Sequence, residues 1–265
     1  MRTFFFTLLI AISSILSAQS LTKEVVQEIA TDGETLYMLE MITRSSSDKI
    51  YADNAMESLT GYVAYKKDGL YHCVYWKGEG DNRMVMHDFS NLNPNKPEYM
   101  NLDGLPRSLN TQEILLSKIK TAAFKSIRGD TEYFKITRGV TLTLHMLEKG
   151  NEIHAFLMAN QRFENTIPIG NDFRIVYDQL GQMKKRARIR SAFTEIPTDV
   201  KPDGNGKIIT AHINEEKPII ISPTDICNLL LYSPSPEMHE HHVMSPRFIC
   251  IYKIGERSLV IKQQN

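Results

Sequence analysis

The hydrophobic period of the sequence changes near Arg138-Gly139. Before this point, residues 111–127 carry apolar side chains three or four positions apart and end beside a glycine, which predicts an amphipathic helix. After it, the spacing predicts a series of strands, at residues 140–147, 152–158, 172–177 and 184–190. We therefore expect an α+β fold, with a mixed helix and strand unit at residues 19–138 and a second domain at residues 139–265.

The first unit also contains predicted strands. Asp68-Gly69 separates two alternating segments, 62–65 and 70–76, and this pair of residues favours a β-hairpin. A further strand is predicted at residues 83–89. Residues 22–41 predict one or two helices, broken at Asp32-Gly33, and the serine-rich residues 45–48 predict a loop.

Residues 1–18 have the pattern of a secretory signal peptide. Arg2 precedes an apolar run of about 12 residues, shorter than the ~20 that a membrane-spanning helix needs. Small residues follow, and we expect cleavage after Ala18, which leaves Gln19 as the new N-terminus. No later segment has the length and hydropathy of a membrane span. The sequence therefore predicts an exported protein, periplasmic or extracellular.

Composition limits the partners. The chain is 42% hydrophobic, which is enough for a folded core, and its 31 basic and 31 acidic residues balance. A protein that binds nucleic acid or anionic membranes in general needs an excess of Lys and Arg, so neither class is expected. The basic cluster at residues 184–190 is interpreted as a strand with a solvated face, and a polyanion contact is the alternative.

Histidine and cysteine residues give two weaker indications, one of a metal site and one of a disulfide. The run His239-Glu240-His241-His242 follows a Ser- and Pro-rich segment, which predicts a solvated turn, with adventitious metal binding as the alternative. Cys227 and Cys250 could pair after export, but free buried thiols fit equally well, and we assign no disulfide.

The most informative segment is 206–232. Its local pattern predicts a strand that runs into His212, then a loop, then a helix that begins at Ser222-Pro223-Thr224-Asp225. Ser222 or Thr224 is a suitable N-cap, Pro223 suits the first turn, and Asp225 suits the positive end of the helix. A strand, a loop and a capped helix without further function would have the same pattern.

This segment resembles the JAMM (MPN-type) metalloprotease family, whose motif is H-x-H-P, about seven residues, then S-x-x-D. The wider chain resembles secreted, largely uncharacterised bacterial proteins with a JAMM-like domain over residues 139–262, on the pieces 152–156, 166–172, 222–232 and 242–248. The resemblance implies a JAMM-like α/β domain with a mixed, mostly antiparallel sheet. It also implies that His212 and Asp225 match two zinc ligands and that Ser222 matches the residue that stabilises the oxyanion.

The general base that the family takes from an earlier strand is assigned to Glu152, with Glu164 as a competitor. Two residues depart from the motif, because Asn214 replaces the second His and Glu215 replaces the Pro. An amide oxygen is a poorer zinc ligand than imidazole, so we expect zinc to bind weakly or not at all.

From this degenerate site we expect a non-catalytic protein that binds a protein or peptide partner in the cell envelope or outside the cell. The alternative is a zinc-dependent peptidase or isopeptidase with an altered metal site. A third possibility places the working surface on the strand-rich N-terminal half.

Overall fold

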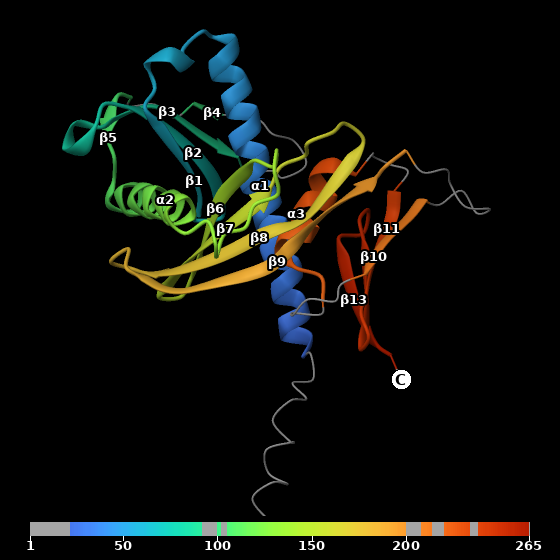
Figure 1. The fold of residues 1–265 in the computed structure, drawn as a ribbon. Helices are drawn as coiled ribbons and strands as arrows, with labels where there is room; N and C mark the ends of the chain where they lie inside the picture. The colour runs from blue at the N-terminus through green and yellow to red at the C-terminus, as the bar shows by residue number, and fades with distance from the viewer. Residues whose placement is uncertain are drawn as a thin grey trace, which may run out of the picture.

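The structure is a computed structural model that describes residues 22–91, 100–101, 105–199, 208–213, 220–233 and 238–264. These residues form three α-helices and three mostly antiparallel sheets, so the predicted α+β class is confirmed (Figure 1). The predicted signal peptide, residues 1–18, lies outside the described residues. The helices are α1 (Lys23–Ala52), α2 (Thr111–Gly129) and α3 (Pro223–Tyr232), with the short 3-10 helices η1 (Met56–Ser58) and η2 (Gly80–Asn82).

Helix α1 is a single helix that runs the length of the molecule (Figure 1). The predicted break at Asp32-Gly33 is wrong, because Gly33 lies inside the helix at its contact with α3. A Cβ atom at Gly33 would come within 2.6 Å of the Cβ atom of Ile226. The glycine therefore marks a close approach of two helices rather than a turn.

The predicted loop at residues 45–48 is also wrong, because these residues belong to α1. The Ser46 hydroxyl donates to the carbonyl oxygen of Ile42 at 2.6 Å, and the hydroxyls of Ser46 and Ser47 each lie 2.8 Å from the hydroxyl of Tyr75. Serine favours turns because its side chain competes for backbone groups, but here partners inside the helix and on a neighbouring strand use these hydroxyls.

The first sheet contains the predicted hairpin. Its strands are β1 (Gly61–Lys67), β2 (Leu70–Lys77), β3 (Met84–Asn91), β4 (Met100–Asn101) and β5 (Arg107–Ser108). They are arranged in the order β1-β2-β3-β4, and β5 pairs with another part of β3. Asp68 and Gly69 both have positive φ, 50° and 82°, as a tight hairpin turn requires, so this prediction is confirmed.

The second sheet is an antiparallel meander of four strands in chain order. They are β6 (Leu142–Lys149), β7 (Glu152–Ala159), β8 (Thr166–Asp178) and β9 (Met183–Pro197). All four were predicted from the sequence, although β8 and β9 are longer than expected. Helix α2 packs on one face of this sheet, and α1 and α3 pack on the other.

The third sheet contains β10 (Ile208–Ile213), β11 (Met238–Met244), β12 (Phe248–Lys253) and β13 (Ser258–Gln263). Strands β10 and β11 are parallel and α3 connects them, whereas the other neighbours are antiparallel. The predicted solvated turn at residues 239–242 is wrong, because these residues lie in β11. The buried side chains of His241 and Val243 alternate with their neighbours, as strand residues do.

Described residues on both sides of Arg138-Gly139 share hydrophobic clusters. One cluster joins Ile119 of α2 to Phe173 of β8, and another joins Leu39 of α1 to Phe156 of β7.

The three cysteines, Cys73, Cys227 and Cys250, are buried free thiols. Among the described helices, none combines the length and the hydropathy needed to cross a membrane.

Candidate functional site

The unit of β10 and α3 has the local structure that the sequence predicts. Ser222 is the N-cap of α3 and Pro223 is in its first turn. The Asp225 backbone N–H donates to the Ser222 hydroxyl at 3.1 Å, and the Ser222 N–H donates to Asp225 Oδ2 at 2.9 Å. This reciprocal capping box fixes the Asp225 carboxylate, whose residue is fully buried, at the positive end of the helix.

The guanidinium of Arg190, from β9, lies between His212 and Asp225. Its Nη1 atom is 2.7 Å from His212 Nε2, and its Nη1 and Nη2 atoms contact the two Asp225 oxygens at 3.4 and 3.2 Å. Arg190 is only 6% exposed, and its Nε atom is buried with no hydrogen-bond partner. A buried cation therefore joins the strand that carries His212 to the helix that carries Asp225.

The charge of Arg190 fixes the direction of a chain of hydrogen bonds. A guanidinium can only donate, so His212 Nε2 accepts and the His212 proton lies on Nδ1. His212 Nδ1 then donates to His241 Nε2 at 2.8 Å, and His241 Nδ1 donates to the Thr210 hydroxyl at 2.8 Å. The two imidazole rings are stacked, with centroids 5.0 Å apart.

Both imidazoles are neutral in this arrangement. Burial lowers the pKa of His212 to about 4, although the Asp225 carboxylate opposes this effect and Arg190 adds to it. Burial also holds the pKa of His241 well below its usual value. The positive charge of this cluster, which we call the Arg190 cluster (Arg190, Thr210, His212, Asp225 and His241), therefore belongs to Arg190.

A second buried carboxyl group lies behind the helix N-terminus. Asp172 Oδ2 accepts from the Thr224 hydroxyl at 3.0 Å, and the Thr224 hydroxyl is 2.8 Å from that of Ser222. Burial, together with the nearby Asp225 charge, raises the pKa of Asp172 to about 8. Asp172 is therefore mainly protonated near neutral pH.

Arg190 points inward because of an irregularity between β8 and β9. Asp172 pairs with Arg190, and Phe173 pairs with Arg188, so β9 contains one residue more than β8 over this step. Such a bulge re-aims the side chains that follow it. Gly170 permits the close approach of the strands, because a Cβ atom there would lie 1.7 Å from the carbonyl oxygen of Ala192.

Sequence reasoning missed both Arg190 and His241. If β9 alternated regularly, Arg190 would lie on the same solvated face as Arg186 and Arg188. Those two side chains are exposed as expected, whereas Arg190 is buried. The bulge that separates Arg190 from them leaves no clear mark in the sequence. For His241 a signal exists, because Val243 two positions later gives the run a strand-like alternation.

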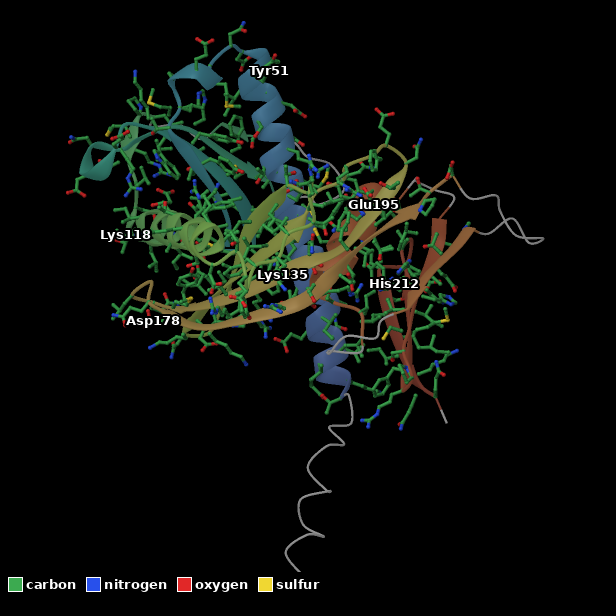
Figure 2. The ribbon with its side chains drawn as sticks, viewed as in Figure 1. Tyr51, Lys118, Lys135, Asp178, Glu195 and His212 are labelled. Carbon is green, nitrogen blue, oxygen red and sulfur yellow. The ribbon has the colours of Figure 1, made fainter. Side chains whose placement is uncertain are left out.

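The predicted site residues fall into two groups. His212, Ser222 and Asp225 lie in one region, around Arg190 and the start of α3. Glu152 begins β7, is exposed, and contacts His154 at 3.2 Å. Its partner across the sheet is Asp178, and Figure 2 shows Asp178 far from His212. The structure therefore does not bring Glu152 to the others, and Asn214 lies outside the described residues.

The described residues of the Arg190 cluster do not fit a zinc ion. His212 Nε2 accepts from Arg190, and the Asp225 oxygens accept from Arg190 and the Ser222 N–H. A metal between them would face the guanidinium charge at close range. Across the described parts of the chain, no three His, Cys, Asp or Glu side chains converge as a metal site would require.

Comparisons with family models, curated proteins and solved structures found no match to this chain.

Proposed function

We propose that this chain is an exported binding protein with a JAMM-like scaffold, and that it binds a protein or peptide in the periplasm or outside the cell without hydrolysing it. The observation that carries the proposal is the position of the Arg190 guanidinium between His212 and Asp225. In the family that the sequence resembles, the corresponding two side chains bind zinc. In this chain the guanidinium of Arg190, a permanent cation, supplies positive charge between those two side chains.

Electrostatics explains why this arrangement disfavours zinc-dependent hydrolysis. A catalytic zinc site keeps one position open for water and lowers the pKa of that water. Arg190 balances the buried Asp225 charge but offers no such position, because a guanidinium only donates hydrogen bonds. The same ion pair and the His212 contact connect β9, β10 and α3, which favours a structural role for the cluster.

The competing function is a zinc-dependent peptidase or isopeptidase that uses Glu152 as the base and His212, Asn214 and Asp225 as ligands. It requires Arg190 to leave the cluster. It also requires Glu152 to move from the exposed start of β7 to the neighbourhood of His212.

Zinc content distinguishes the two functions. The mature chain, made without a His-tag, is incubated with excess zinc, dialysed and subjected to elemental analysis. We expect well under one zinc per chain. Stoichiometric zinc that is lost in His212→Ala, together with hydrolysis of a peptide, would contradict the proposal.

A pair of double variants tests the scaffold itself. Arg190→Met with Asn214→His removes the competing cation and restores the second histidine of the motif, so we expect it to bind close to one zinc per chain. Arg188→Met with Asn214→His is the matched control, because Arg188 is an exposed neighbour on the same strand. If the first variant folds and gains no zinc over the control, the JAMM-like assignment is wrong.

A further inference from the structure

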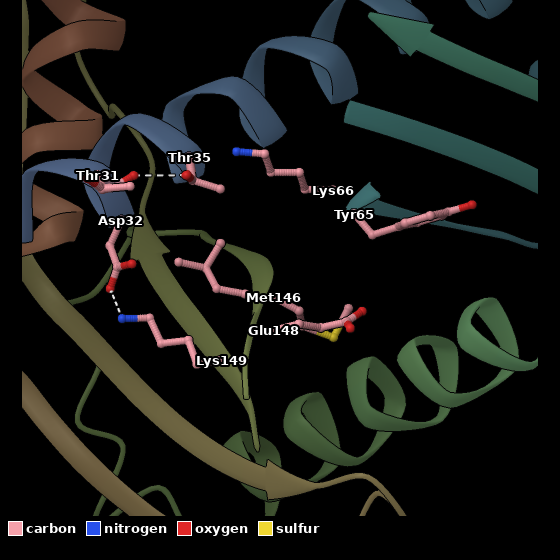
Figure 3. A pocket seen from close by; sticks show the side chains of 9 residues that line it. Thr31, Asp32, Thr35, Tyr65, Lys66, Met146, Glu148 and Lys149 are labelled. Atoms are coloured by element: carbon pink, nitrogen blue, oxygen red, sulfur yellow. Dashed lines mark hydrogen bonds and ion pairs between the residues drawn. The ribbon is translucent and has the colours of Figure 1, made fainter. Parts of the chain in front are cut away.

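A pocket of about 250 Å³ lies between the first turns of α1, the sheet β7–β9 and the segment that enters α3. It is separate from the Arg190 cluster, although Ser222 borders both. Asp32 and Lys149 line this pocket and also a second one of about 240 Å³ between α1, β1 and β6 (Figure 3). We call the first of these the α1–α3 pocket.

The walls of the α1–α3 pocket are mainly apolar. Val25 and Ile29 contribute from α1, Phe156 and Ile189 from the sheet, and Ile220 from the segment before α3. Val25 is 38% exposed, whereas Phe156 is 1% exposed. The pocket therefore has an accessible rim and a buried apolar floor, as sites for small organic groups do.

Three cations and two carboxylates also line the pocket, and two of the cations have partners. Lys149 contacts Glu28 and Asp32, each at 2.5 Å, so its charge is compensated. The Arg188 guanidinium donates to the carbonyl oxygen of Tyr133 at 2.9 Å and stacks on the Tyr133 ring.

Arg174 differs from the other two cations. Its Nε atom is buried with no hydrogen-bond partner. Among the described residues no carboxylate is in ion-pair contact with it, although the pKa of nearby Glu28 is lowered mainly by Lys149 and to a smaller extent by Arg174. It lies in the floor of the pocket, between its strand partners Phe156 and Ala187. A buried guanidinium N–H without an acceptor is costly, and a carboxylate that binds both N–H groups of one edge would satisfy it.

We propose that the α1–α3 pocket binds a monocarboxylate whose charged group pairs with Arg174 and whose apolar group contacts Ile29, Phe156 and Ile189. A monoanion is favoured over a phosphate dianion because Glu28 and Asp32 are in the same pocket. If each non-hydrogen atom of a ligand takes up about 30 Å³, the volume of one water molecule in the liquid, the pocket of about 250 Å³ holds roughly eight such atoms. A short fatty acid has this size, and so has a C-terminal leucine of a peptide.

This inference builds on the proposed binding function and names the chemistry of the ligand. Calorimetric titration of the mature chain compares two probes, hexanoate for a free acid and N-acetyl-leucine for a peptide C-terminus. Their neutral counterparts, hexanamide and N-acetyl-leucinamide, are the controls. For ligands of this size we expect a Kd on the order of 0.1–1 mM for at least one acid. We expect binding at least tenfold weaker for the amides.

Variants identify the site. Arg174→Met should weaken binding at least tenfold, and Arg186→Met, which removes an exposed cation of the same strand pair, should leave Kd unchanged. Val25→Trp fills the rim without altering the core, so it should block binding even if Arg174→Met does not fold. If neither acid binds, or if Arg174→Met and Val25→Trp both fold and bind normally, the proposal is wrong.

The outcome is independent of the zinc experiment. Acid binding by a chain that also holds stoichiometric zinc would leave the pocket intact and overturn the proposed function. Failure of both acids in a chain without zinc would overturn only the pocket.

Discussion

Arg190 donates from Nη1 to His212 Nε2 at 2.7 Å, and the two residues come from different sheets. This contact orients the imidazole, places its proton on Nδ1, and directs that proton to His241. The Arg190 cluster is consequently a connected buried network rather than a set of separate ligands. Its stability should depend on the arginine more than on either histidine.

We therefore expect Arg190→Met to destabilise the fold by about 3–5 kcal/mol, because it leaves the buried Asp225 carboxylate without its cation. Urea unfolding followed by circular dichroism measures this change. The control Arg188→Met, on the exposed face of the same strand, should lower the free energy of unfolding by about 1 kcal/mol or less. Adding Asp225→Asn to Arg190→Met should restore part of the loss. A loss below about 1 kcal/mol in Arg190→Met would show that the ion pair carries little of the stability.

The contact between α1 and α3 gives a second prediction. Gly33→Ala should destabilise by about 1–3 kcal/mol, although alanine is the better helix former, because the added Cβ would lie 2.6 Å from Ile226. Gly129→Ala is the matched control, since no atom lies within 4 Å of its added Cβ and its φ is not positive. The control should be neutral or stabilising by up to about 1 kcal/mol. Equal thermal midpoints for the two variants would contradict the close helix packing.

Asp172 predicts a dependence of stability on pH. Its pKa is raised from 3.8 to about 8 in the folded protein, so between these values the folded state keeps a proton that the unfolded state loses. The contribution of Asp172 to the free energy of unfolding should therefore be greatest at low pH. It should fall as pH rises from about 4 to 8, by roughly 1 kcal/mol per pH unit. Asp172→Asn should reduce this slope and raise stability at pH 8.

The control for that measurement is Asp178→Asn. The N–H of Gln182 and the nearby Lys184 ammonium hold the pKa of Asp178 below its usual value, so it titrates below the pH range in question. Chemical unfolding at several pH values between about 5 and 8 compares the three proteins. A slope that is the same in Asp172→Asn and in the unmodified chain would rule out Asp172 as its source.

Export is tested directly by the N-terminus of the mature chain. We expect mass spectrometry of the protein from the periplasm or the culture medium to find a chain that starts at Gln19. Ala18→Leu changes the small residue at the cleavage site and should slow processing, with retention of the longer chain. A mature protein that keeps residues 1–18 would contradict the signal peptide.

The sequence by itself determined the elements whose causes are local. The period of residues 111–127 predicts α2, Asp68-Gly69 predicts the hairpin turn, and Ser222 with Asp225 predicts the capped start of α3. Each of these signals acts over a few residues, through hydrophobic period, backbone conformation or one capping bond. For that reason the α+β class and most strands follow from the sequence alone.

Tertiary structure decided the features that depend on distant partners. Gly33 and Ser46 remain helical because α3 and Tyr75 contact them, and Arg190 is buried because a bulge opposite Asp172 turns it inward. His212 and Asp225 lie 13 positions apart, but the group between them comes from β9, and local pattern does not predict that contact. Local sequence therefore determined which residues could form a site, whereas strand register and packing decided that an arginine lies within it.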